Sequence, residues 1–192
     1  GNLRFQGTGD GRFVAYAADT GKVLWAVPVM IGIIAPPITY QVDGEQYVAV
    51  MAGYGGAGGV TGGDPRTMAS GKYLNDGYVL AFKLGGTAAM PRVAEKNASI
   101  PEQPAIEATA AQIDNGKYRY GGTCMVCHGA LVVSGGVVPD LRMLPPEKHA
   151  IFKEIVYDGV IHGAGMPKMG DLVTEQDVQD IHAYIITRAN QD

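Results

Sequence analysis

Short apolar runs separated by turn residues fill residues 1–85 of the chain. The runs are rich in β-branched and aromatic residues: "LRFQGT", "RFVAYAA", "KVLWAVPV", "PPITYQV", "EQYVAVMAG" and "DGYVLAFKLGG". Most are joined by short turns that contain Gly and Asp, and this pattern predicts six antiparallel strands. Residues 53–75 contain too much glycine for a strand or a helix, so we expect them to form a long loop.

The pattern changes after residue 85. Pro91, Pro101 and Pro104 lie among small and polar residues, and neither a strand period nor a helix period is present before about Ile106. We therefore expect three parts: strands at residues 1–85, a linker at residues 86–105, and a helical domain at residues 106–192. The linker is expected to be semi-extended and to lie over the surface of one domain.

Three segments of the last part have apolar residues at helical spacing. These residues are Ile113 and Tyr120 in the first segment, Ile151, Phe152, Ile155 and Val156 in the second, and Val178, Ile181 and Ile185 in the third. On the first face, Gly116 would let another helix approach closely. The second helix is expected to end at Gly159. The third is expected to begin with Thr174 as its N-cap, with Asp177 completing a variant capping box.

Composition and charge exclude two classes of function. The 192 residues are 46% apolar and carry a net charge of −4, with no long run of either sign. A nucleic-acid surface would need a basic stripe, and none is present. No window approaches the roughly 20 apolar residues of a membrane span, so no membrane-spanning segment is expected.

Both cysteines of the chain lie in "GGTCMVCHGA", residues 121–130. A zinc site would need a second ligand pair at suitable spacing, and a thioredoxin-like dithiol would need a strand before it and a βαβ context. Neither is present. The remaining reading is Cys-x-x-Cys-His, in which Cys124 and Cys127 attach a c-type haem and His128 offers its imidazole to the iron. The sequence therefore predicts haem c.

The stretch "AYAADTGKVLW", ending at Trp25, resembles the tryptophan-docking motif of the eight-bladed β-propellers of quinoprotein dehydrogenases. One departure is Ala17, where that motif has an acidic residue. The resemblance implies that Trp25 packs between neighbouring blades; a core aromatic of another β-sandwich is the alternative. "GIIAPPITYQVDGEQYVAVMAGYGG" is similar to the last blade of the alcohol-oxidising members. The implied fold is antiparallel β, a partial propeller of about two blades, with open strand edges.

The stretch "GMPKMGDLVTEQDVQDIHAYI" resembles the axial-methionine loop and last helix of small bacterial cytochromes c. This resemblance implies an all-α class I cytochrome c domain in which Met166 is the sixth iron ligand. Met169 is then expected in the core or the haem wall, and His162 at the surface, with bis-histidine ligation as the alternative. His149 and His182 fall on polar helix faces and are expected to be ordinary.

The loop "VVPDLRM" is similar to the same cytochromes. By that resemblance the Pro139 carbonyl accepts a hydrogen bond from His128 and fixes its tautomer. Arg142 would pair with a haem propionate; a solvated surface charge is the alternative. Tyr120 and Tyr184 would pack where the first and last helices cross.

Together the two halves resemble the C-terminal end of a quinohaemoprotein alcohol dehydrogenase. That family implies a periplasmic enzyme with pyrroloquinoline quinone and calcium on the propeller, which passes electrons to the haem and then to a small cytochrome or copper protein. No catalytic residue is assigned here, because the family's quinone-site Asp and vicinal cysteine pair belong to earlier blades.

Six strands cannot close a propeller, which needs about 4–8 blades of four strands. We therefore expect the remainder of a dehydrogenase propeller, or further copies of this chain, to complete it. The chain is then an electron-transfer module, with two alternatives: part of a complete quinone-dependent enzyme, or a cytochrome that oligomerises through its strands.

Overall fold

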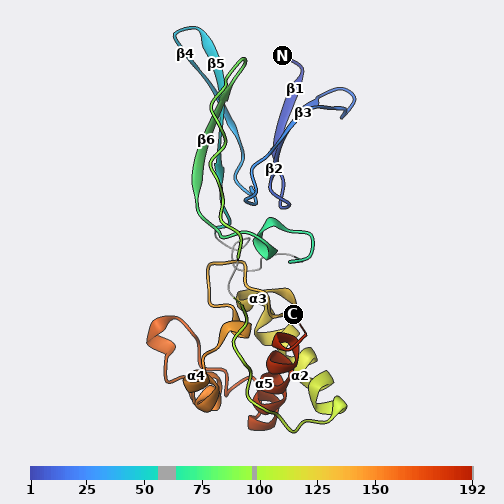
Figure 1. Cartoon of the computed structure of the whole chain (residues 1–192), viewed down its shortest axis with the longest axis vertical. Helices are drawn as coiled ribbons and strands as arrows, with labels where there is room; N and C mark the ends of the chain where they lie inside the picture. The colour runs from blue at the N-terminus through green and yellow to red at the C-terminus, as the bar shows by residue number, and fades with distance from the viewer. Residues whose placement is uncertain (56–63, 97–98, 192) are drawn as a thin grey trace. The chain divides into compact units, whose positions relative to one another are not determined.

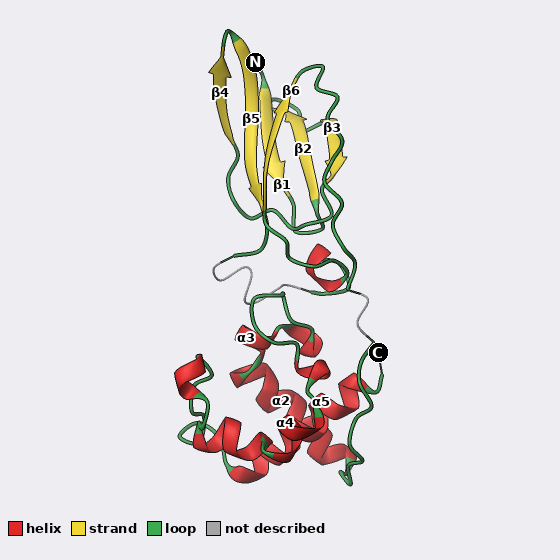
Figure 2. Cartoon of the chain, turned by 60° about the vertical axis from the view of Figure 1, so that its left-hand side comes forward, coloured by secondary structure: helices red, strands yellow, loops and turns green. Residues whose placement is uncertain are grey.

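The computed structural model describes residues 1–55, 64–96 and 99–191 of the chain. These form two compact units. The sheet unit comprises Gly1–Asn97 together with Ser134–Val138, and the helical unit comprises Ala98–Val133 and Pro139–Asp192. Figure 2 shows the strands of the first unit and the helices of the second in different colours.

The sheet unit contains two three-stranded antiparallel sheets (Figure 1). The first has the order β1 (Leu3–Gly7), β2 (Arg12–Ala17), β3 (Val23–Pro28), and the second the order β4 (Ile38–Val42), β5 (Glu45–Ala52), β6 (Tyr78–Lys83). The six predicted strands are confirmed. The β4–β5 connection is a two-residue turn, in which Asp43 and Gly44 both have positive φ, 51° and 80°. Such a turn favours Asp-Gly because glycine adopts this conformation without a steric penalty.

Aromatic side chains join the two sheets. Phe13 of β2 stacks on Phe82 of β6 with ring centroids 5.3 Å apart. Trp25 of β3 packs edge-to-face with Phe82 and with Phe13, with ring centroids 5.4 and 6.1 Å apart. Trp25 therefore contacts the neighbouring sheet, although 41% of its surface is exposed; its packing between propeller blades stays a prediction.

Apolar side chains also lie exposed along the strands. They are Leu3, Val23, Leu24, Ile38, Val42, Met51 and Val79. Each sheet has three strands among the described residues, so its outer strands have unpaired edges there. The sequence predicts such open edges and half-exposed apolar faces.

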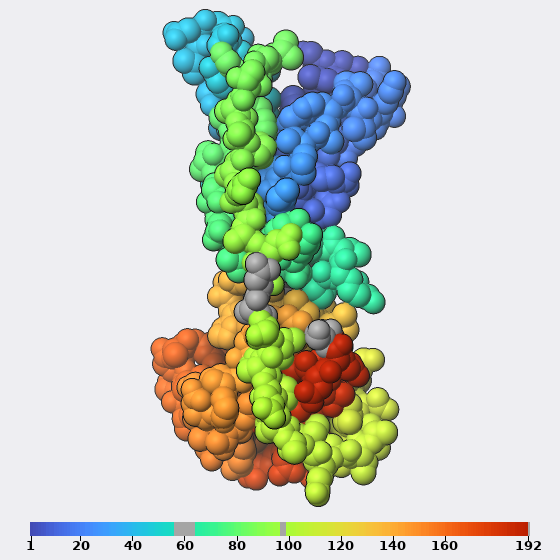
Figure 3. Space-filling model, in the orientation of Figure 1, coloured from blue at the N-terminus to red at the C-terminus, as the bar shows by residue number. Residues whose placement is uncertain are grey.

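The segment that follows β6 runs along the surface of the sheet unit (Figure 3). The main-chain amide of Leu74 donates to the carbonyl of Ala94 at 2.9 Å, and Val93 is buried in the core of this unit. This part of residues 86–105 is extended, as expected. Part of the predicted glycine-rich loop, residues 56–63, lies outside the described residues; the described end of that loop contains a short 3-10 turn, η1 (Ala69–Gly71).

The helical unit is built around two long helices. Its elements are α2 (Ala110–Thr123), α3 (Met125–His128), η2 (Ala130–Val132), η3 (Leu141–Met143), α4 (Pro146–Ala150), η4 (Glu154–Asp158), η5 (His162–Ala164) and α5 (Glu175–Ala189). The first helix begins at Ala110, later than the expected start near Ile106. The Thr109 hydroxyl accepts from the Gln112 amide and forms a capping box, which fixes the helix start there.

The second predicted helix is interrupted, which corrects the expectation of one continuous helix. It ends at Ala150, and Ile151 has φ −117° and ψ 26°. A π-helical turn then covers Glu154–Asp158 and ends at Gly159 in the left-handed conformation, as predicted. The break moves Ile151 off the apolar face, so that it is 38% exposed, whereas Phe152 stays buried.

Helices α2 and α5 cross at Gly116. A Cβ atom on this glycine would lie 1.9 Å from the Asp180 carbonyl oxygen, so only glycine permits the observed approach. Next to this contact, the rings of Tyr120 and Tyr184 pack at 5.5 Å. The predicted close approach and tyrosine contact are both confirmed. Thr174 caps α5 in the predicted capping box with Asp177.

Candidate haem site

The cysteine motif occupies the end of α2 and the whole of α3. Cys124 is the C-cap of α2, and its carbonyl accepts hydrogen bonds from the amides of Cys127 at 3.1 Å and His128 at 2.9 Å. The two thiols are therefore separated by one helical turn. Cys124 is buried, which raises the pKa of its thiol, and Cys127 is exposed. One thiol thus lies within the core and the other at its surface.

The imidazole of His128 is buried and oriented by the main chain. Its Nδ1 lies 2.9 Å from the Pro139 carbonyl oxygen. Because a carbonyl can only accept, Nδ1 must carry the proton. The Nε2 atom of the neutral ring then keeps its lone pair, as iron coordination requires. The hydrogen bond expected from the cytochrome resemblance is present.

The turn after His128 is held by both long helices. The Tyr120 hydroxyl of α2 donates to the Gly129 carbonyl at 2.8 Å, and Nε of Arg188 in α5 donates to the Leu131 carbonyl at 3.3 Å. Leu131 and Val132 both have positive φ, 56° and 67°. Such backbone is costly for a β-branched residue and persists only where its surroundings hold it.

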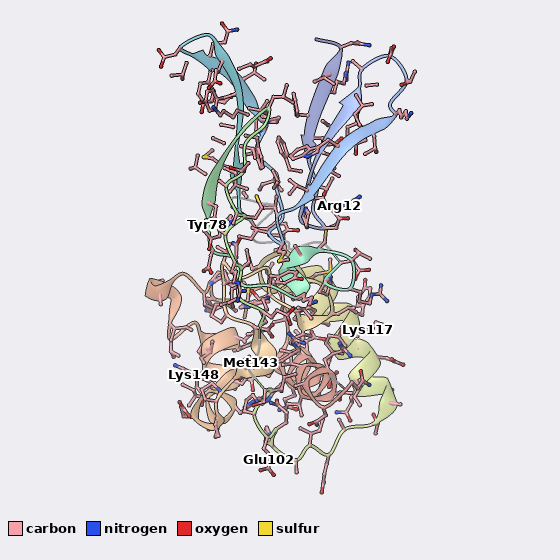
Figure 4. The ribbon with its side chains drawn as sticks, turned by 45° about the horizontal axis from the view of Figure 1, so that its top comes forward. Arg12, Tyr78, Glu102, Lys117, Met143 and Lys148 are labelled. Atoms are coloured by element: carbon pink, nitrogen blue, oxygen red, sulfur yellow. The ribbon has the colours of Figure 1, made fainter. Side chains whose placement is uncertain are left out.

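Arg142 is mostly buried and paired with Asp140. Nη2 lies 2.7 Å from Asp140 Oδ2 and Nε 3.0 Å from Oδ1, so the guanidinium meets the carboxylate with two nitrogens. The alternative of a solvated surface charge for Arg142 is therefore wrong. Its pairing with a propionate stays a prediction. Met143, which follows Arg142 in η3, is labelled in Figure 4.

The loop with the two candidate methionines follows η5. Gly165 is left-handed, with φ 98°, and Met166 is partly buried against the apolar core of the unit. Met169 is buried within that core, as predicted, and His162 is exposed. The loop is bonded to the segment before it, because the Met169 amide donates to the Val156 carbonyl at 2.8 Å.

The core of the helical unit contains both soft sulfur groups and aromatic rings. Its buried members include Tyr120, Cys124, Val132, Phe152, Ile155, Val156, Met169, Val173, Val178, Ile181, Tyr184 and Ile185. Met166 packs against this cluster. Among the described residues no three His, Cys, Asp or Glu side chains gather as a metal site. A buried thiol, a partly buried thioether and an oriented imidazole fit an attached haem.

The sequence did not predict a contact between two histidines, one buried and one partly buried. His149 of α4 is 8% exposed, and its Nδ1 lies 2.8 Å from Nε2 of His182 in α5. Phe152 stacks on the His182 ring at 4.2 Å. The expectation that both histidines are ordinary residues on polar faces is therefore wrong. No local spacing signals this pair, because its two histidines are 33 residues apart in sequence.

Two family models match the chain. Residues 111–185 match the family described as cytochrome C oxidase, cbb3-type, subunit III. Residues 1–48 match the family described as glucose/ethanol/alcohol dehydrogenase, beta-propeller domain. None of the helices among residues 1–55, 64–96 and 99–191 combines the length and apolar character needed to cross a membrane.

Relatives match both units together. The chain is 46% identical to quinohemoprotein alcohol dehydrogenase ADH-IIG of Pseudomonas putida, over 99% of this chain and 26% of that protein. It is 38% identical to the dehydrogenase subunit of the alcohol dehydrogenase (quinone) of Acetobacter aceti, over 99% of this chain and 26% of that protein. The chain thus spans about a quarter of the length of these relatives.

Solved structures agree with this match. The Pseudomonas putida HK5 ADHIIG structure superposes with a TM-score of 0.72 at 44% identity, covering 98% of this chain and 27% of that one. The quinohemoprotein alcohol dehydrogenase of Comamonas testosteroni gives 0.64 at 31% identity, covering 99% and 27%. The chain corresponds to the C-terminal region of quinohaemoprotein alcohol dehydrogenases, with strands of their propeller followed by their cytochrome c domain.

Proposed function

We propose that the helical unit binds haem c covalently and transfers electrons as the cytochrome module of a quinohaemoprotein alcohol dehydrogenase. Cys124 and Cys127 form the thioethers, and His128 ligates the iron through Nε2. The observation that carries this proposal is the hydrogen bond from His128 Nδ1 to the Pro139 carbonyl, which leaves Nε2 as the ring's acceptor.

Three further roles complete the proposed site. Met166 is the sixth ligand, and a thioether in this position favours a raised reduction potential. Arg142, already oriented by Asp140, pairs with a propionate. The buried apolar core of the helical unit would exclude water from the iron. Bound haem supplies the one-electron redox couple, and these residues hold it, orient it and set its potential.

The finer organisation is also a proposal. Residues 1–85 provide two partial propeller blades, residues 86–105 a linker, and residues 106–192 a class I cytochrome c domain. The exposed strand faces support a partner made of further blades, either the remainder of a dehydrogenase propeller or other copies of the chain. Pyrroloquinoline quinone and calcium belong to the complete propeller. The proposed electron acceptor is a small cytochrome or copper protein, and the proposed compartment is the periplasm.

The experiment that tests the haem proposal begins with maturation of the chain in a host that attaches haem c. We expect a reduced-minus-oxidised spectrum of a c-type cytochrome and a pigment that stays with the polypeptide through acid–acetone extraction. A colourless protein, or pigment that washes out, contradicts the proposal.

Substitutions of two methionines in the same loop test which residue is the sixth iron ligand. Met166→Leu should abolish the long-wavelength charge-transfer band of methionine-ligated ferric haem and lower the reduction potential. Met169→Leu, in the same loop and buried in the core, should keep both. If the band survives Met166→Leu, that residue is not the ligand.

The exposed strands also favour a second role, oligomerisation of the cytochrome through the sheet unit. Sedimentation of the haem-loaded chain distinguishes the two. A stable multimer supports assembly through the strands, and a monomer supports a partner outside this chain.

A further inference from the structure

The pair formed by the buried His149 and the partly buried His182 links two elements of the helical unit that are 33 residues apart in sequence. One neutral imidazole donates to the other at 2.8 Å, and the rings lie nearly parallel with centroids 5.1 Å apart. The next aromatic residue, Phe152, stacks on the His182 ring with centroids 4.2 Å apart. Three rings therefore hold the segment 146–158 against α5.

Among the residues that the structure describes, no acidic side chain contributes to the pKa values of this pair. Burial lowers the pKa of both imidazoles, and the pKa of His182 falls to about 4 because the charge of His149 also opposes its protonation. The Leu144 main chain partly offsets the effect on His149. Apart from this main-chain interaction, His149 Nε2 has no partner of hydrogen-bond geometry among the described residues. A proton taken up here is therefore buried without a counter-charge.

The charged residues that are close to the pair in sequence are exposed, partly exposed or paired with other residues. Glu147 of α4 is exposed and Lys148 is partly exposed (labelled in Figure 4). In the next turn Lys153 lies 3.5 Å from Asp158. Arg142, in the turn η3 that packs against α5, is paired with Asp140.

The segment held by the pair is bonded to the methionine loop. The Val156 carbonyl accepts from the Met169 amide at 2.8 Å, and the Tyr157 carbonyl from the Gly170 amide at 3.2 Å. A Cβ atom on Gly170 would lie 2.6 Å from the Tyr157 carbonyl oxygen, so the two stretches of main chain are in close contact. Movement of residues 152–158 away from α5 would carry the loop with it.

We propose that His149 and His182 are positioning residues, which hold the Met166 loop in place while neutral and release it when both are protonated. The inference rests on the proposed role of Met166 as iron ligand. One proton can be shared across the 2.8 Å contact, but two protons place like charges edge to edge and leave no acceptor between the rings. The pair then gains by separating into water, where each imidazole takes up a proton near its ordinary pKa of about 6.5.

Two measurements on the haem-loaded chain test the inference. The first follows the charge-transfer band of methionine-ligated ferric haem as the pH is lowered. We expect a reversible loss of the band between about pH 6.5 and pH 4, with uptake of about two protons. The second follows hydrogen exchange at the Met169 and Gly170 amides, whose protection should fall over the same range.

The variants separate the pair from other causes. His182→Phe keeps a ring against Phe152 but cannot be protonated, so the midpoint of both transitions should fall by about one pH unit or more. His162→Gln, which removes the exposed histidine of the neighbouring turn, should leave both midpoints unchanged. If His182→Phe is not helical at neutral pH by circular dichroism, His182→Gln replaces it, because its amide still bonds to His149.

An unchanged midpoint in folded His182→Phe or His182→Gln overturns the inference, as does a shifted midpoint in His162→Gln. Absence of the band in the unaltered chain at neutral pH would instead contradict Met166 ligation. In that case the exchange of the two amides still decides whether the histidine pair holds the loop.

Discussion

Replacing Gly116 with alanine should force α2 and α5 apart. The new Cβ would lie 1.9 Å from the carbonyl oxygen of Asp180 and 2.4 Å from its carbonyl carbon. Real Cβ contacts are essentially never shorter than 3.0 Å, so the helices must separate by about 1 Å or more. Both obstructing atoms belong to main chain, and no change of side-chain rotamer can relieve the contact.

The size of the effect follows from three contributions. Overpacking of a well-packed contact costs about 1–3 kcal/mol. Separation also weakens the packing of Tyr120 on Tyr184, which contributes about 0.5–1.5 kcal/mol beyond area burial. Alanine recovers about 1 kcal/mol through its higher helix propensity. We therefore expect Gly116→Ala to lower the free energy of unfolding of the helical unit by about 0.5–3.5 kcal/mol.

The assay is urea unfolding of the haem-loaded chain, followed by helical circular dichroism. Fluorescence of the single tryptophan, Trp25, reports the sheet unit separately and should not shift. Gly122→Ala is the matched control in the same helix, because its Cβ would meet nothing within 4 Å. It should raise the free energy of unfolding by up to about 1 kcal/mol. Equal urea midpoints for Gly116→Ala and Gly122→Ala would refute the reasoning.

Three further outcomes are expected in the helical unit. Thr174→Ala removes the capping box of α5 and should lower the unfolding free energy by about 1 kcal/mol, whereas Thr187→Ala in the same helix should have a smaller effect; thermal unfolding compares them. Tyr120→Phe leaves the Gly129 carbonyl without its hydroxyl donor and should lower the free energy of unfolding in urea by about 1–3 kcal/mol. Tyr118→Phe is the control, because Tyr118 is 76% exposed, and its free energy of unfolding should match that of the unaltered chain. The pKa of His182 is about 4 in the folded chain and about 6.5 in the unfolded chain, so the unfolded state binds more protons between these values and the free energy of unfolding should fall as the pH drops from 6.5 to 4. The shift corresponds to about 3 kcal/mol, which the partial exposure of His182 reduces to about 2 kcal/mol. A pH-independent urea midpoint would contradict this expectation.

Much of the fold could be predicted because its signals are local. The Asp43-Gly44 turn requires positive φ at two adjacent residues, and few residue types other than Asn, Asp and Gly satisfy it. The capping box at Thr174 is likewise contained in four consecutive residues. The predicted role of Gly116 needed only that another helix cross at that face. In each case the residues that determine the structure are adjacent or one turn apart.

The interrupted helix and the histidine pair could not be predicted in this way. Helical spacing places Ile151 and Ile155 on one face, but it does not register the change to a π turn at Glu154. His149 follows two charged residues and looks solvent-facing by composition. Its burial depends on which part of α5 lies opposite, and His182 is 33 residues away. Packing between distant segments decides both features, and a single sequence does not carry that information.

Within the candidate site, too, the local features could be predicted and the features that depend on other segments could not. The cysteine motif is local, and its chemistry could be read from five consecutive residues. The orientation of His128 needs Pro139, and that partner came from a family resemblance. The Asp140 partner of Arg142 was not predicted, although it lies two residues away. The pair forms here across the start of the 3-10 turn Leu141–Met143, and that turn was not expected.

The two sides of the candidate site are held by different kinds of contact. On the imidazole side, α2 and α5 hold the turn after His128 through Tyr120 and Arg188. Each of these helices begins with a capping box, and the two pack closely at Gly116. On the methionine side, the loop is tied to a short segment that contains a helix break, a π turn and the histidine pair. Local opening proceeds where few buried contacts hold the main chain. The imidazole side is therefore the rigid half of the site, and the methionine side is the half whose geometry acid or substitution can change first.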